Sequence, residues 1–283
     1  MQTFKIVTII GPGLIGASLG LALKEKGLAE EVIGAGRRES SLQTALDIGA
    51  IDRSTLDPAE GVKGADLVVL ATGVATALKL GLAVMPHLKS GCLLTDVASA
   101  KTYLVDGLAP EVRDDVSYVS SHPMAGSEQK GAAAARVDLF DGAPCILTST
   151  TATRAGDLDR VRELWESLGS RTCELDPKSH DLFLAEVSHL PHIAASSLFN
   201  TIHTDSLEYS ATGFKDTTRL ASGDPEIWLE ISICNRTALT SALRSYADEL
   251  TSFAEALESN DEQTVLKKLT AAKEKRDGFY RDK

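Results

Sequence analysis

The fold is decided at the N-terminus, where FKIVTII at residues 4–10 runs directly into GPGLIG at residues 11–16. The first stretch has the continuous apolar pattern of a buried strand, and the second opens a helical pattern over 14–26. In such a strand-turn-helix unit, one glycine makes the tight turn, the next lets a pyrophosphate approach the backbone, and the third allows close helix packing. We therefore predict a dinucleotide-binding turn made by Gly11, Gly13, Leu14, Ile15 and Gly16.

The same alternation of short apolar runs and amphipathic stretches continues to about residue 176. It predicts strands at 4–10, 31–35, 67–72, 92–96, 116–120, 144–148 and 171–175, with helices at 14–26, 40–48, 75–87, 101–109 and 157–168. Successive βαβ units of this kind form a largely parallel sheet. Residues 1–176 are therefore expected to be an α/β domain of the Rossmann type, with modifications.

Strand signals stop after residue 176. The pattern predicts long helices at 178–203, 225–258 and 261–280, joined by a Gly/Thr/Asp-rich connector at 205–224. Apolar positions in these helices are too frequent for one narrow stripe, which indicates burial on more than one side. We expect an all-helical second domain over 177–283 and a homodimer formed through it.

Composition sets further limits. The 283 residues are 43% hydrophobic and 24% charged, which is typical of two globular domains. A net charge of −11, spread along the chain, argues against nucleic-acid and membrane partners. The first apolar stretch is interrupted by Gly11, so it cannot form a secretory signal or a membrane span of ~18 residues. Four scattered cysteines without a CxxC pair indicate reduced thiols and a cytoplasmic protein.

The choice of dinucleotide depends on Gly36, Arg37 and Arg38. An NAD site usually has Asp or Glu about 20 residues after the glycine turn, where it accepts hydrogen bonds from the ribose 2′-OH. No acid stands at this position, and two guanidinium groups could bind a 2′-phosphate. We therefore predict that NADP is preferred. The alternative is that the arginines are solvated and that the protein also accepts NAD.

Candidate catalytic residues follow two neighbouring strands. The segment SSHPMAGSE at 120–128 places His122 on a loop at the carboxyl edge of the sheet, where such folds bind ligands. The segment TDVASAK at 95–101 ends the preceding strand, so Ser99 would reach the same crevice.

Other candidates lie in the helical part. His189 and His192 are three residues apart on one helix and could suggest a metal ion, but Pro191 distorts that turn and no third ligand is evident. We predict no metal. Arg219 ends the segment GFKDTTR at 213–219, where either an anion-binding role or a structural clamp with Asp216 is consistent with the sequence.

Taken in order, five segments are similar to the prephenate/arogenate dehydrogenase family of tyrosine biosynthesis: GPGLIG, DVASAK, SHPMAGSE, HD with SHLPH, and GFKDTTRLASGDPEIW. The resemblance covers residues 4 to 236 and departs at DVASAK, where family members often have DVGSVK. It implies a modified Rossmann domain followed by a helical dimerisation domain. It also implies oxidative decarboxylation of prephenate with hydride transfer to NAD(P)+.

The resemblance also implies roles for single residues. His122 would be the catalytic base for the C4 hydroxyl, because histidine can accept a proton near neutral pH. Ser99 would hydrogen-bond that histidine and the substrate hydroxyl, His192 would contact the substrate side chain, and Arg219 would anchor the ring carboxylate. Further expected members of the site are Ser121 and His189 for substrate, Thr72 and Asp96 for cofactor, and Glu128, Asp181 and Asp216 as acids beside Arg219.

Several alternatives remain open. Arogenate carries an ammonium that Glu186 could face, whereas His192 suits the keto acid of prephenate, which we favour. A β-hydroxyacid dehydrogenase or imine reductase would carry a catalytic lysine on the helix at 178–203, but only Lys178 is present, at its start. A non-catalytic dinucleotide sensor would have lost residues such as His122. No regulatory domain is expected after the last helix.

Overall fold

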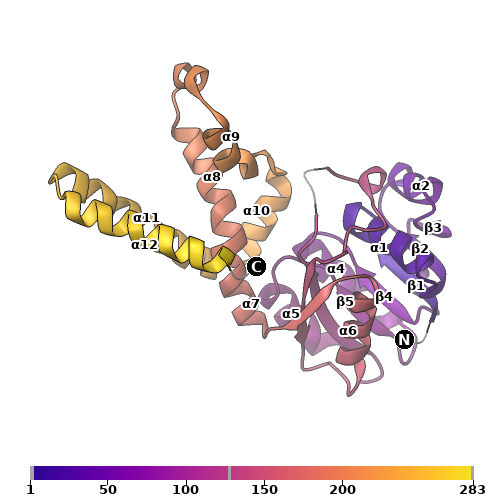
Figure 1. Ribbon diagram of the computed structural model, residues 1–283. Helices are drawn as coiled ribbons and strands as arrows, with labels where there is room; N and C mark the ends of the chain where they lie inside the picture. Colours follow the sequence, from indigo (N-terminus) through magenta and orange to yellow (C-terminus); the bar gives the residue numbers. More distant parts are fainter. Residues whose placement is uncertain (1–2, 127–128, 282–283) are drawn as a thin grey trace. The chain divides into compact units, whose positions relative to one another are not determined.

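An eight-stranded sheet organises the first part of the computed structural model, which describes residues 3–126 and 129–281 (Figure 1). Its strands are β1 (Phe4–Ile10), β2 (Ala29–Ala35), β3 (Arg53–Thr55), β4 (Leu67–Leu70), β5 (Leu93–Asp96), β6 (Ser117–Pro123), β7 (Pro144–Ser149) and β8 (Arg171–Glu174). Their order is β3-β2-β1-β4-β5-β6-β7-β8, and all neighbours are parallel except β6 and β7. The first six strands have the order of dinucleotide-binding folds, in which ligands bind where the order reverses, between β1 and β4.

The predicted α/β architecture is confirmed, with one strand that the sequence did not indicate. β3 has only three residues, Arg-Ser-Thr, at the edge of the sheet. It pairs with β2 through the register Gly34↔Ser54. Such a short polar segment has no apolar periodicity to detect, so it forms only because β2 offers an edge.

Helices cover both faces of this sheet. The main helices are α1 (Leu14–Glu25), α2 (Glu39–Asp47), α3 (Pro58–Gly61), α4 (Val74–Val84), α5 (Thr102–Leu108) and α6 (Asp157–Ser167). Short 3₁₀ turns are η1 (Met85–His87), η2 (Ala109–Glu111) and η3 (Ala132–Ala134). Ile9 of β1 belongs to a core cluster with α1, α2 and α6, whereas the adjacent Ile10 belongs to a cluster with α4 and α5. Adjacent residues of a strand face opposite ways, so β1 is buried on both sides and reads as a continuous apolar run.

The chain from 177 to 236 is helical. Its elements are α7 (Pro177–Leu184), the π-helix η4 (Ala185–His189), α8 (Leu190–Thr201), η5 (Thr204–Tyr209), α9 (Thr212–Thr218), η6 (Arg219–Ser222) and α10 (Pro225–Cys234). The prediction of one regular helix over 178–203 is wrong in its middle, because Pro191 lacks an N–H and its ring crowds the preceding turn. The connector at 205–224, expected to be irregular, contains short helices.

The prediction of one helix over 225–258 is also wrong. Asn235 leaves the helical region, with φ −107° and ψ 27°, and separates α10 from α11 (Arg236–Glu258). Its buried amide donates to the carbonyl of Asp181 at 2.7 Å and lies 3.1 Å from Nδ1 of His189. These distant partners fix the break.

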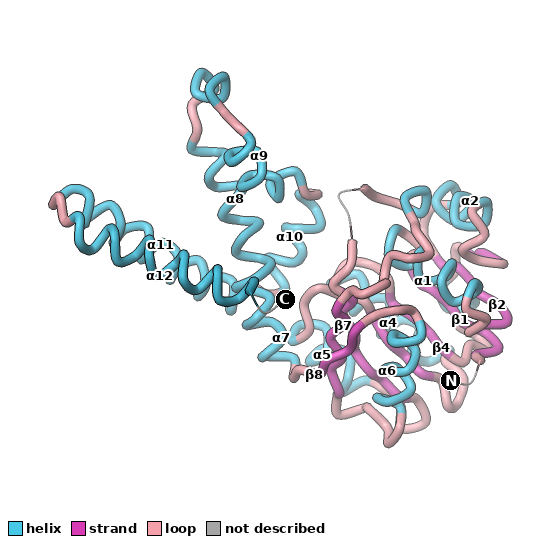
Figure 2. Tube along the Cα trace, viewed as in Figure 1, coloured by secondary structure: helices cyan, strands magenta, loops and turns pink. Residues whose placement is uncertain are grey.

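Residues 237–283 form a second compact unit, distinct from residues 1–236. It consists of most of α11 and of α12 (Glu262–Arg281), as Figure 2 shows. Lys268 of α12 bonds Glu249 of α11 at 2.8 Å and lies over the ring of Phe253. No helix within the described residues is both long and apolar enough to cross a membrane.

Candidate active site

The glycine turn has the geometry that its sequence requires. Gly11 has φ +89°, and a Cβ on it would lie 2.5 Å from Cγ2 of Thr72. A Cβ on Gly16 would lie 2.6 Å from the carbonyl oxygen of Gly11. Only glycine fits at these two positions.

The helix that follows this turn begins without any negative charge of its own. α1 starts at Leu14, its N-cap Gly13 supplies no side-chain hydrogen bond, and its first turn contains no acid. The first N–H groups of an α-helix have no partner within the helix and attract anions. A Cβ on Gly13 would meet no protein atom within 4 Å, so protein packing does not demand glycine there, whereas a closely approaching pyrophosphate would.

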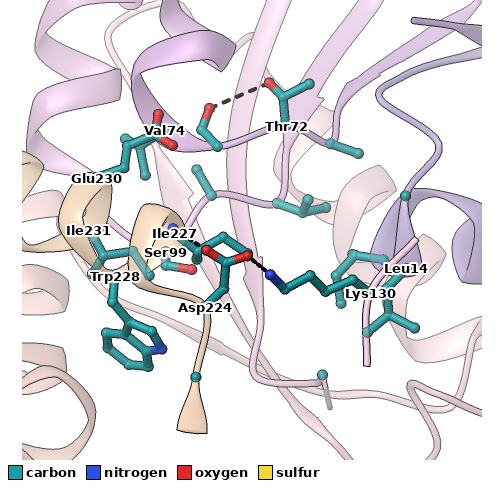
Figure 3. Close-up of a pocket in the computed structure, with 18 of the residues that line it drawn as sticks. Leu14, Thr72, Val74, Ser99, Lys130, Asp224, Ile227, Trp228, Glu230 and Ile231 are labelled. Carbon is teal, nitrogen blue, oxygen red and sulfur yellow. Dashed lines mark hydrogen bonds and ion pairs between the residues drawn. The ribbon is translucent and has the colours of Figure 1, made fainter. Parts of the chain in front are cut away.

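A pocket of about 580 Å³ joins this turn to Ser99, whereas His122, His192 and Arg219 do not line it. Sequence-predicted residues that line it are Gly13, Leu14, Ile15, Arg38, Thr72 and Ser99. Trp228, Ile227 and Ile231 of α10 form another part of its wall, as Figure 3 shows. A pocket of this size and mixed lining is typical of a cofactor or substrate site. Arg37 is exposed and does not line it.

Two acids in the pocket wall were not foreseen from the sequence. Glu230 accepts hydrogen bonds from the backbone N–H groups of Ala75 at 2.6 Å and Thr76 at 3.3 Å, so it caps α4 from α10. Asp224 caps α10 itself and pairs with Lys130, toward which it points in Figure 3. Asp224-Pro225 is a recognisable helix start, whereas no sequence signal marks Glu230.

His122 lies in a strand, not on a loop as predicted. β6 continues to Pro123 because β7 pairs with it, and His122 stands opposite Ile146. The His122 side chain is buried. Its Nδ1 lies 2.8 Å from Nε2 of His180, and Nδ1 of His180 lies 2.9 Å from Oδ1 of Asp181.

The carboxylate of Asp181 is in turn held by hydrogen bonds from backbone N–H groups. Its two oxygens accept hydrogen bonds from the N–H groups of Lys101 at 2.7 Å and Thr102 at 2.8 Å. Burial alone would raise the pKa of Asp181, but the hydrogen bonds from His180 and from these two amides outweigh it and lower the pKa. The carboxylate therefore stays ionised.

Both histidines of this chain of contacts are neutral near pH 7. Burial lowers the pKa of His122 well below its usual value, and the positive charge of Lys101 acts in the same direction. Burial also lowers the pKa of His180, although its hydrogen bond to Asp181 opposes this.

Two further predicted site residues make hydrogen bonds within the protein. Asp96 is fully buried, and four groups donate to its carboxylate: the N–H of Ala98, Nζ of Lys101, the hydroxyl of Tyr118 and the hydroxyl of Ser120. These donors use both oxygens of Asp96, so its side chain organises this edge of the sheet. Ser121 is equally buried and donates to the carbonyl of Asp96 at 2.5 Å. Their contacts with cofactor and substrate stay predictions.

The other two predicted histidines differ from each other. His189 is buried, and Nδ1 of its ring lies 3.1 Å from the amide of Asn235. Burial lowers the pKa of His189 to about 4, so its ring is neutral near pH 7, and its contact with the substrate stays a prediction. His192 is 5% exposed and stacks on Trp228, with ring centroids 3.7 Å apart. Its buried Nδ1 has no hydrogen-bond partner within the described residues, which leaves it available to a ligand.

The expected acids do not surround Arg219 in the described part of the chain. Arg219 is exposed at the start of η6 and makes no ion pair with a described residue. Asp181 is bound to the start of α5, Asp216 is exposed, and Glu128 lies outside the described residues. Among residues 3–126 and 129–281, no three His, Cys, Asp or Glu side chains form a group that could hold a metal ion.

The strand order, the uncapped α1 and the pocket at the reversal point define a dinucleotide-binding fold of the kind that dehydrogenases use. Residues 19–174 match the family model "Prephenate dehydrogenase, nucleotide-binding domain", and residues 176–271 match "Prephenate dehydrogenase, dimerization domain". The chain therefore belongs to the prephenate dehydrogenase family.

Comparisons with individual proteins support the same family. The chain is 32% identical over 286 residues to a prephenate dehydrogenase of Bacillus subtilis (strain 168), with 98% of this chain and 77% of that protein covered. It is 32% identical over 273 residues to a cyclohexadienyl dehydrogenase of Zymomonas mobilis, with 94% and 93% covered. The crystal structure of prephenate dehydrogenase from A. aeolicus with hydroxyphenyl propionate and NAD+ superposes with a TM-score of 0.89 at 28% identity, covering 97% of this chain and 98% of that one.

Proposed function

We propose that this chain catalyses the oxidative decarboxylation of prephenate to 4-hydroxyphenylpyruvate, with reduction of a nicotinamide dinucleotide. The observation that carries the proposal is the 580 Å³ pocket in which the glycine turn and Ser99 meet. Membership of the prephenate dehydrogenase family supports the same reaction.

The reaction requires a base for the C4 hydroxyl and protein groups that bind the substrate in position. When bound, the nicotinamide accepts the hydride that leaves C4 of the ring. His122 takes the proton of the C4 hydroxyl as the carbonyl forms, through a ring nitrogen that starts neutral. The C1 carboxylate then leaves as CO2, its bonding electrons aromatise the ring, and a proton returns to the C4 oxygen.

Other residues orient the substrate in this proposal. Ser99 lines the pocket and positions the C4 hydroxyl. The unpartnered Nδ1 of His192 receives a polar group of the substrate side chain, and Arg219 binds the ring carboxylate. The glycine turn with Leu14, Ile15, Thr72 and Arg38 holds the dinucleotide.

The pocket favours prephenate over arogenate. Among the described residues that line it, the acids are Asp224 and Glu230, and both carboxylates are already engaged. Glu186 is exposed on η4 and does not line the pocket. A free carboxylate would be needed to pair with the ammonium of arogenate, whereas the keto acid of prephenate needs none.

Purified protein mixed with each substrate and each cofactor, followed by the absorbance of the reduced nicotinamide, tests the proposal. We expect turnover with prephenate and weak turnover with arogenate. Absence of turnover with both substrates would reject the function, and faster turnover with arogenate would reject the substrate.

Preference for NADP rests on Arg38, which lines the pocket after a strand end that carries no acid. Gly36→Asp would add a negative charge beside a 2′-phosphate and an acceptor for a free 2′-OH. A Cβ at Gly36 would lie 3.3 Å from Cδ2 of Leu42, a contact that a small movement of the leucine relieves. We expect the ratio of kcat/KM for NADP to that for NAD to fall at least about tenfold, or ~1.4 kcal/mol.

The matched control for this prediction is the double variant Arg37→Ala/Arg38→Ala. It should weaken NADP far more than NAD, because only NADP carries the 2′-phosphate. Equal losses for both cofactors, or equal kcat/KM in the wild type, would mean that the arginines are solvated and that NADP is not preferred.

We also propose a homodimer formed through the helical part, residues 177–283, as the second domain. Large apolar side chains between α7 and α10 are exposed: Leu182, Phe183, Val187, Ile227, Leu229 and Ile233. Exposed apolar surface of this extent marks a protein interface. Sedimentation should give twice the chain mass of 30.1 kDa, and a monomer at micromolar concentration would reject the dimer.

Four free cysteines support a cytoplasmic location, which cell fractionation would check.

A further inference from the structure

Three buried side chains, His122, His180 and Asp181, form a hydrogen-bonded row from the proposed base to the start of α5. Asp181 lies at the end of this row and accepts hydrogen bonds from the N–H groups of Lys101 and Thr102, where α5 begins. His180 lies between Asp181 and His122, at 2.9 Å and 2.8 Å from them. His180 is completely buried, and Asp181 is 4% exposed. The residues come from α7 and β6, so the contacts exist only in the folded chain.

The two hydrogen bonds have one possible direction when both rings are neutral. An ionised carboxylate only accepts, so Nδ1 of His180 must carry its proton toward Asp181. Nε2 of neutral His180 then carries the lone pair and can only accept. Nδ1 of His122 must therefore carry the proton that fills the 2.8 Å contact. A neutral imidazole has one N–H, so Nε2 of His122 carries the lone pair.

We infer that His180 and Asp181 are positioning residues, which hold His122 in the Nδ1–H tautomer and keep its Nε2 free to accept the substrate proton. The inference rests on the proposed function for the identity of that proton. It assigns a role to His180, which no other interaction of the site explains. It also gives Asp181 a role different from that of a counter-charge to Arg219.

The same row of side chains stabilises the protonated form of His122 that the proton transfer produces. When the C4 hydroxyl proton arrives at Nε2, His122 becomes an imidazolium with protons on both nitrogens, and its Nδ1–H still donates to His180. Nearby Lys101 opposes this charge, and His189 adds to the opposition if it is protonated. Asp181 is the compensating negative group, and the charge of Asp96 also raises the pKa of His180. The orienting acid of a Ser-His-Asp triad works on the same principle, there without an intervening imidazole.

Two substitutions at His180 separate positioning from packing. His180→Leu introduces an apolar side chain of similar size and removes the acceptor, so nothing fixes the tautomer of His122. His180→Gln places an amide oxygen near the position of Nε2 and can still accept from Nδ1–H of His122. We expect kcat to fall about 10²-fold in the leucine variant and about tenfold in the glutamine variant, with KM for prephenate nearly unchanged in both.

A second readout needs no turnover. Nitrogen-15 NMR of labelled histidine rings should show His122 as the Nδ1–H tautomer in the wild type and in His180→Gln, and predominantly as Nε2–H in His180→Leu. The inference is overturned if wild-type His122 is the Nε2–H tautomer, or if His180→Leu retains the wild-type tautomer and kcat. If the wild type has the expected tautomers but no activity with prephenate, the proposed reaction fails while the positioning role stands.

Discussion

His122→Asn should lower kcat by about 10²–10⁴-fold, because a positioned acid-base group typically contributes this much. The substitution is mild for the structure. The amide group of asparagine can donate to Nε2 of His180 from near the position of the lost Nδ1, so the buried contact at 2.8 Å has a replacement. Cofactor and substrate dissociation constants should therefore change little, which titration of the protein fluorescence would measure.

A matched control is His203→Asn, which makes the same chemical change at an exposed histidine. It should leave kcat unaltered. An unchanged kcat in His122→Asn itself would remove His122 from the mechanism, whatever the result at position 203.

The pH dependence gives His122 a second signature. The base works only when neutral, so kcat/KM should fall as the pH decreases through the pKa of His122. Burial and the neighbouring Lys101 lower that pKa below its usual value, so activity should persist at pH values where an exposed histidine is already protonated. The residual activity of His122→Asn should lack this acidic limb.

The sequence predicted those elements whose burial pattern is visible within a short stretch of chain. β1 and α1 were recognisable because a strand buried on both faces is continuously apolar, because Gly11 has a positive φ, and because Gly16 packs on the carbonyl of Gly11. The sequence also assigned Thr72 to the cofactor and Ser99 to the crevice of the site, and both residues line the pocket.

What the sequence did not predict depends on partners far along the chain. His122 was expected on a loop because the strand signal fades before it, yet pairing with Ile146 of β7 extends the strand. Asp181 was assigned to Arg219 by charge alone, since a sequence does not show that the backbone N–H groups of Lys101 and Thr102 would bind it. The helix break at Asn235 likewise follows from its contacts with Asp181 and His189.

Arg219→Ala should raise KM for prephenate by about 10- to 150-fold, which corresponds to the ~1.5–3 kcal/mol of a hydrogen bond to a charged group. The guanidinium is exposed and makes no ion pair with any residue in the described ranges, so no protein carboxylate competes for it. Its segment leads into Gly223, where a Cβ would lie 2.7 Å from Cε1 of His192, so η6 ends directly beside the proposed substrate histidine. Steady-state kinetics with prephenate measures the effect, and kcat at saturation should change less than KM.

Stability separates the two interpretations of Arg219 that the sequence allowed. A structural clamp would lose unfolding free energy on substitution, whereas an arginine without a protein partner should lose almost none, as urea denaturation would measure. Lys215→Ala is the control, since it removes one positive charge from an exposed position of neighbouring α9 and should shift KM only slightly. If Arg219→Ala and Lys215→Ala raise KM equally, the arginine contributes only general charge to the approach of a dianionic substrate. If Arg219→Ala leaves KM unchanged, the ring carboxylate is held by another group, and Arg219 is a solvated surface residue.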